Sequence, residues 1–103
     1  MRRITLNIGL LDKDSKMQEV NTLDAYKIVY NIMQKDCTIM QGMGVYTHED
    51  GTVVYEPSLQ VMMLDFNNSI SVDWMQDKIK ALKIALNQES IVLQEDDIKS
   101  ELK

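Results

Sequence analysis

The sequence predicts an α+β domain with the element order strand, helix, strand, strand, helix, strand. Residues 3–10 alternate apolar and polar side chains with the period of two of a half-buried strand. Residues 38–65 read as a long β-hairpin, because two apolar runs flank the turn His48-Glu49-Asp50-Gly51 and Asp-Gly suits tight turns. Apolar residues recur every three or four positions in residues 22–35 and 72–87, which predicts two amphipathic helices.

The first strand and the first helix are separated by a polar, aperiodic loop at residues 11–19. Asn21 is a good helix N-cap, and Asp24 at the third helical position forms a short version of the capping box. The expected helix runs to about Lys35. Its core stripe is Ala25, Tyr26, Val29, Ile32 and Met33.

The central hairpin contains residues that interrupt a regular sheet. Gly42 and Gly44 lie in the expected second strand, residues 38–47, where glycine commonly marks a bend or the close approach of another group. Pro57 cannot donate a ladder hydrogen bond and does not suit the middle of a sheet. We therefore expect residues 52–56 to form a hairpin arm that extends past the sheet, and residues 58–64 to lie within it.

The second helix is well marked, with Ser71 as its N-cap and Asp73 in the first turn, where the helix dipole favours an acid. Its sheet-facing stripe is expected to be Val72, Met75, Ile79, Leu82 and Leu86. A second stripe should meet the first helix: Trp74, Ala81 and Ala85. Residues 90–94 read as the last strand, so we expect one domain over residues 1–94 and a charged tail over residues 95–103.

This element order is that of the ferredoxin-like βαββαβ plan, a four-stranded antiparallel sheet with both helices on one face. Right-handed crossovers place the first and third strands at the centre of the sheet. The topology also brings several strand and helix ends to one end of the molecule, near Asp12 and Thr22. We call the residues expected there the polar corner: Glu56, Ser58, Gln88, Glu89 and Ser90.

Three short segments resemble a known family. They are Gly9-Leu10, residues 50–58 (Asp-Gly-Thr-Val-Val-Tyr-Glu-Pro-Ser) and residues 88–92 (Gln-Glu-Ser-Ile-Val). They are similar to the pattern of a bacterial family of small single-domain proteins of unknown function, which has a DGxxxxEPS segment in mid-chain and a QESV segment at the last strand. The resemblance covers most of the chain. It implies the same fold and supplies no activity.

Composition restricts the classes of function. Sixteen acidic and eleven basic residues give a net charge of -5, which disfavours direct binding to nucleic acid or to an anionic membrane. No run of about 18 apolar residues and no signal-peptide pattern is present, so we expect a cytoplasmic protein that does not enter the membrane. Cys37 and His48 are single residues of their kinds, far short of a zinc site, and we expect neither a metal nor a cofactor.

Two surfaces are candidate sites. If Ile4, Leu6 and Ile8 face the helices, alternation places apolar side chains around Gly42 and Gly44 on the opposite, open sheet face: Met40, Tyr46, Met62, Leu64 and Val92. Eight methionines in 103 residues favour an adaptable interaction surface there. The polar corner has two carboxylates that could hold a small polar ligand or a cation, or perform acid–base chemistry. Its residues could equally serve only as hydrogen-bond partners of turns and helix ends.

Three functional hypotheses follow. The preferred one is a non-enzymatic interaction protein that buries its open sheet face in a homodimer or against a protein partner. The second is a small-molecule binder or cofactor-free enzyme, with its site in a dimer pocket or at the polar corner; it rests on analogy between folds. The third is a small acidic inhibitor, of the kind phages encode, that occupies a basic nucleic-acid site on another protein.

Overall fold

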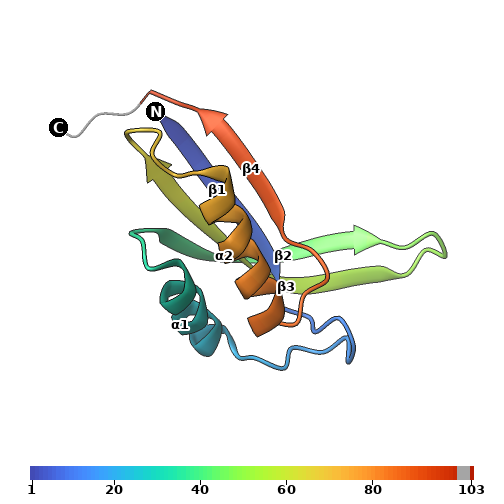
Figure 1. Cartoon of the computed structure of the whole chain (residues 1–103). Helices are drawn as coiled ribbons and strands as arrows, with labels where there is room; N and C mark the ends of the chain where they lie inside the picture. The colour runs from blue at the N-terminus through green and yellow to red at the C-terminus, as the bar shows by residue number, and fades with distance from the viewer. Residues whose placement is uncertain (100–102) are drawn as a thin grey trace.

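The computed structural model describes residues 1–99 and 103. Its six elements follow the predicted order (Figure 1): β1 (Arg2–Gly9), α1 (Thr22–Met33), β2 (Thr38–Thr47), β3 (Val53–Asp65), α2 (Val72–Ala85) and β4 (Val92–Asp97). The four strands form one antiparallel sheet in the order β2-β3-β1-β4. Both helices cover the same face of it (Figure 1). The predicted ferredoxin-like fold is therefore confirmed, with β1 and β3 at the centre.

The hydrophobic core lies between the helices and the central strands. Alternate residues of β1 and β3 point toward the helices and are almost fully buried: Ile4, Leu6, Ile8, Leu59, Val61 and Met63. The helices contribute buried residues at helical spacing, Ala25, Val29 and Met33 from α1 and Met75 and Leu82 from α2, and Leu86 directly after α2 is buried with them. Successive side chains of a strand point to opposite faces, so the residues between these buried ones lie on the face without helices, here called the open sheet face.

The expected hairpin arm is present. β3 pairs with β2 from Val53 to Met62, but β1 pairs only with the part of β3 that begins at Ser58. Beyond that point the two strands continue alone as a hairpin arm, residues 43–57, which projects from the body of the molecule (Figure 1). Gly51 at its tip has a φ of 88°, as expected for the glycine of this turn.

Both helices begin at the predicted caps. The Asn21 side chain accepts a hydrogen bond of 2.8 Å from the Asp24 amide, and Ser71 Oγ accepts one of 3.1 Å from the Trp74 amide. α1 ends at Met33, before the expected Lys35, because Gln34 takes a left-handed conformation with a φ of 50°. α2 likewise ends at Ala85 rather than near residue 87.

The predicted sheet-facing stripe of α2 is correct except for its first residue, Val72. Val72 immediately follows the cap and is 65% exposed, whereas Met75, Leu82 and Leu86 are buried as expected. Trp74 packs against the core from the second stripe. Its ring is also covered by Lys35 Nζ, 5.4 Å from the ring centroid, so the segment that follows α1 reaches α2 at this point.

The last strand also differs from the expectation. β4 spans Val92–Asp97 rather than residues 90–94, so residues 95–97, which were expected in the charged tail, belong to the sheet. The reason is tertiary: Arg2 and Arg3 on β1 lie opposite Asp97 and Asp96 on β4. Arg3 makes a 3.2 Å ion pair with Asp96. The expectation for residues 100–102 falls outside the described residues.

Candidate functional site

Two residues of the polar corner, Glu56 and Ser58, lie on the open sheet face. They alternate along β3 with Pro57 and Leu59, and Leu59 is fully buried under the helices. The sequence predicted them in the polar corner, and the strand register also places them on the same face as Met40 and Met62. A carboxylate and a hydroxyl therefore lie on that face, paired across the β2–β3 ladder with Gly44 and Gly42.

Glycines flank these two side chains on both neighbouring strands. A Cβ atom on Gly9 of β1 would lie 2.6 Å from the Glu56 carboxylate, too close for any side chain to be tolerated without movement. On β2, Gly44 pairs with Glu56 and Gly42 pairs with Ser58. A Cβ on Gly42 would lie 3.3 Å from Ser58 Oγ. The three glycines thus leave a strip of the sheet without side chains of its own, here called the glycine slot, and the Glu56 carboxylate occupies the space over Gly9.

The Glu56 carboxylate is held at the end of β1. Its Oε2 atom accepts a hydrogen bond of 3.3 Å from the backbone N–H of Leu11. The backbone carbonyl of Leu11 accepts one of 2.9 Å from Gln88 Nε2. Glu56 and Gln88 therefore meet at Leu11 as the topology predicted, but from opposite sides. Gln88 is buried at the end of α2, whereas Glu56 is half-exposed.

The other polar-corner residues are more exposed. Glu89 and Ser90 both lie at the surface after α2. Glu89 lines a shallow depression of about 410 Å³ together with Lys13, Lys83, Ile84, Asn87 and Gln88. The polar corner was expected close to Asp12. Asn87, which directly precedes Gln88, confirms this for the α2 side of the corner, because its Nδ2 donates to Asp12 Oδ1 at 2.8 Å. This bond, with the amides of Ser15 and Asp14, holds the pKa of Asp12 below its ordinary value of 3.8.

The apolar residues predicted for the open sheet face all alternate onto it by strand register. Met40, Tyr46, Leu64 and Val92 are between 38% and 56% exposed, and Met62 is half-buried. Polar residues cross the centre of the face: the Asn7 side chain bonds to Gln60 at 3.1 Å and to Gln94 at 3.0 Å. The face therefore combines an apolar rim with a polar centre.

The opposite end of the sheet has a buried ion pair that the sequence did not reveal. Arg2 donates to Asp65 Oδ2 at 3.0 Å and to the Ile70 carbonyl at 2.7 Å. Burial alone would raise the pKa of Asp65, but the amides of Ile70 and Ser69 together with the Arg2 guanidinium outweigh it and hold that pKa below 3.8. The pairing of Arg2 with Asp65 follows from the β1–β3 register, so only the assembled sheet could reveal it.

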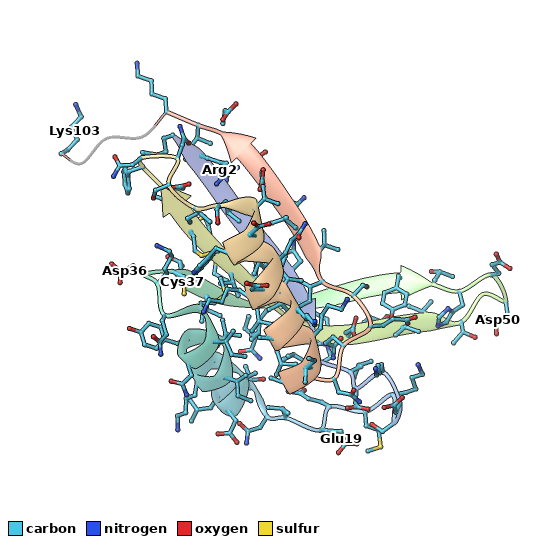
Figure 2. All side chains as sticks on the ribbon, viewed as in Figure 1. Arg2, Glu19, Asp36, Cys37, Asp50 and Lys103 are labelled. Atoms are coloured by element: carbon cyan, nitrogen blue, oxygen red, sulfur yellow. The ribbon has the colours of Figure 1, made fainter. Side chains whose placement is uncertain are left out.

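Neither Cys37 nor His48 takes part in a candidate site. Cys37 is half-buried after α1 (Figure 2), and burial raises the pKa of its thiol, so it is not an activated nucleophile. His48 lies near the arm tip, edge-on to the Tyr46 ring at 5.7 Å. Within residues 1–99 and 103, no group of three or more His, Cys, Asp or Glu side chains is arranged to hold a metal ion. No helix in the described part of the protein is long and apolar enough to span a membrane.

Comparisons with known proteins support the fold. No family model matches the sequence, so the resemblance to a bacterial family stays a prediction, and no curated protein matches it. Among solved structures, a phage SAM lyase in complex with S-methyl-5′-thioadenosine is similar over 93% of this chain and 80% of its own, with 23% identity and a TM-score of 0.65. A phage SAM lyase in the apo state is similar over 92% of this chain and 78% of its own, with 22% identity and the same TM-score of 0.65. At these identities the likeness shows a shared fold.

Proposed function

We propose that this protein is a phage-type enzyme that cleaves S-adenosylmethionine at its sulfonium centre and releases S-methyl-5′-thioadenosine. The observation that carries the proposal is the Glu56 carboxylate, which lies beside Gly9 and Gly44 on the open sheet face and accepts a hydrogen bond from the Leu11 amide. The fold is shared with a lyase for this substrate over 93% of the sequence, which supports the choice of substrate. The proposal takes the second of the sequence hypotheses in place of the preferred one.

The substrate and the site are chemically matched. S-adenosylmethionine carries a sulfonium and an ammonium group, and a carboxylate in a partly apolar setting attracts such cations more strongly than one in bulk water does. The adenine ring is flat, and Gly42 and Gly44 carry no side chain that would block its approach to the sheet beside Glu56. We assign Glu56 the role of binding the cationic part of the substrate over the glycine slot.

The cleavage itself needs no cofactor. The bond between the sulfonium sulfur and the γ-carbon of the methionine part breaks, and its electron pair stays on sulfur to give the neutral thioether. The substrate's own carboxylate oxygen can form the new bond to that γ-carbon, which closes a cyclic ester. All atoms and charges are then accounted for within the substrate. The protein accelerates the reaction mainly by holding the substrate with its carboxylate oxygen close to the γ-carbon.

The test is to incubate the purified protein with S-adenosylmethionine and to measure S-methyl-5′-thioadenosine by liquid chromatography. We expect turnover, and we expect Glu56→Gln to lower it by at least about 100-fold, as the loss of one electrostatic contact in an active site often does. Glu49→Gln is the matched control, because it removes the same charge from an exposed site at the arm tip. No turnover by the unaltered protein, or equal turnover by the Glu56→Gln variant, would contradict the proposal.

A second candidate function is association through the open sheet face, either with another copy of the protein or with a different partner protein. The observation that favours it is the exposure of large apolar side chains there, with Met40 at 47%, Tyr46 at 45% and Val92 at 56%. It is compatible with catalysis, since a neighbour on this face would also shield Glu56 from water.

The acidic-inhibitor hypothesis stays a prediction. The acidic residues on which it depends lie at separate places: Asp12 and Asp14 near the end of α2, Asp50 at the arm tip (Figure 2), and Asp96 in an ion pair at the edge strand.

A further inference from the structure

Gln88 is more firmly held than an amide side chain at a helix end usually is. It is only 8% exposed. Its Nε2 group donates to the Leu11 carbonyl at 2.9 Å and to the Leu86 carbonyl at 3.2 Å. Its backbone N–H donates to the Lys83 carbonyl at 2.9 Å. Three hydrogen bonds therefore anchor Gln88 to the end of α2 and leave its side chain pointing at the end of β1.

Leu11 is the residue at which this anchor reaches the candidate site. Its carbonyl accepts from Gln88 on the helix side, and its N–H donates to Glu56 on the open sheet face. One residue earlier, the Leu10 N–H donates to the Pro57 carbonyl at 2.8 Å, so the backbone here is still tied to β3. The orientation of Leu11 is thus determined by Gln88 from one side and by β3 from the other.

The bond from Leu11 to Glu56 is sensitive to small movements. At 3.3 Å between N and Oε2 it is near the long end of the range for such hydrogen bonds. A shift of Leu11 by a few tenths of an ångström away from Glu56 would break it. The carboxylate also lies where a Cβ of residue 9 would be, so Gly9 provides the room for this position.

We infer that Gln88 is a positioning residue for Glu56, acting through the backbone of Leu11 while Gly9 leaves the space that the carboxylate occupies. The hydrogen-bonded connection stands on the structure alone, and its consequence for S-adenosylmethionine rests on the proposed function. The competing explanation is that Gln88 only caps α2. That role would affect stability and leave the Glu56 carboxylate where it is.

The first experiment replaces Gln88 with Met, which keeps the length of the side chain and removes both N–H donors. The matched control is Gln76→Met, the same substitution on the exposed face of α2. NMR spectra of the full-length protein report the Leu11 amide and the carboxyl carbon of Glu56. We expect both signals to move in Gln88→Met and neither to move in Gln76→Met. Unmoved signals in a folded Gln88→Met variant overturn the inference.

Kinetics with S-adenosylmethionine give the functional measurement. We expect Gln88→Met to raise KM about five- to tenfold, the effect of about one neutral hydrogen bond, with kcat changed less than about twofold. A loss of stability with unchanged KM would mean that Gln88 acts only as a helix cap, and would overturn the inference. If Glu56→Gln itself has normal activity, the proposed function fails, but the NMR result still decides whether Gln88 positions the carboxylate.

A second variant covers the case in which Gln88→Met does not fold. Gly9→Ala displaces the Glu56 carboxylate directly, and it causes little strain because Gly9 lies in an ordinary strand and its Cβ would meet only the flexible end of a side chain. We expect it to move the signals of the Leu11 amide and of the Gln88 side-chain amide, since coupling between two groups is reciprocal. If the Glu56 carboxyl signal moves while the signals of the Leu11 amide and the Gln88 side-chain amide do not, the coupling through Leu11 is absent and the inference is wrong.

Discussion

At the scale of single residues, Asp65 is the one charged residue that is buried in the described part of the protein. It is 3% exposed and accepts hydrogen bonds from the amides of Ser69 and Ile70 and from Arg2. These donors join the end of β3, the turn before α2 and the start of β1. Because the Asp65 charge is buried and paired with Arg2, removal of either side chain leaves the other charge without its partner, and the desolvation of that charge is then not offset.

We predict that Asp65→Asn lowers the free energy of unfolding by about 2 kcal/mol or more near neutral pH, because charged hydrogen bonds are lost and Arg2 loses its partner. Urea unfolding followed by circular dichroism measures it. Asn67→Asp, an exposed site in the same turn, controls for changes of charge in that segment. A free energy of unfolding equal to that of the unaltered protein would contradict the role of the pair.

The same residue predicts a pH dependence. The pKa of Asp65 is below 3.8 in the folded protein and close to that ordinary value in the unfolded state. Its stabilisation is therefore fully present above the unfolded pKa and is lost as the pH falls through the lower, folded pKa. We expect the difference in stability between the unaltered protein and Asp65→Asn to shrink as the pH falls below about 4. A difference that stays constant down to about pH 2 would be inconsistent with this.

At the scale of elements, the hairpin arm is less well supported than the rest of the sheet. Among the described residues, no strand pairs with the arm besides β2 and β3, and only its base is bonded to the segment after β1, through Pro57 and Glu56. Met43, Val45 and Tyr55 are each at least 59% exposed. A two-stranded hairpin has little stability of its own. We therefore expect the arm to open locally at a lower free energy than the body of the molecule.

Gly51→Ala tests this expectation. The glycine has a φ of 88°, and nothing lies within 4 Å of the place where a Cβ would be, so the cost of alanine, about 1 kcal/mol, is purely conformational. We predict faster hydrogen exchange for the His48 amide, which donates to the Thr52 carbonyl at 2.8 Å, with global unfolding almost unchanged. An equal acceleration of exchange in β1 would show that arm and body open together, against the prediction.

At the scale of the whole molecule, the sheet is covered on one face only. The helices lie over one side, and the open sheet face presents Met40, Tyr46, Leu64 and Val92 together with the glycine slot. The molecule is elongated, with extents of 46 × 26 × 25 Å, and the arm continues this face beyond the body (Figure 1). An apolar surface of this kind is typical of an interface.

We predict that the protein self-associates through this face and that Met62→Glu disrupts the assembly, because it places a charge next to Met40 and Leu64. Size-exclusion chromatography with light scattering measures the mass. Val72→Glu is the control, since Val72 is an exposed apolar residue on α2, away from the face. A protein that is strictly monomeric at all concentrations, or an assembly insensitive to Met62→Glu, would contradict self-association.

The sequence by itself determined the features that depend on neighbours along the polypeptide. Asn21 and Ser71 cap their helices because a cap needs only the amides two or three residues later. The alternation of β1 and β3 separated the buried residues from those of the open sheet face, since strand geometry has a period of two wherever the strand lies. Pro57 marked the start of the arm because its missing N–H is a local property.

Only the tertiary structure decided the features that depend on register between distant strands. β4 extends to Asp97 because its acids meet Arg2 and Arg3 of β1, and Asp65 meets Arg2 across the β1–β3 pair. Glu56 lies beside Gly9 for the same reason, on the open sheet face. A shift of one residue in that pairing would turn these side chains to the other face, and nothing local to either strand specifies it.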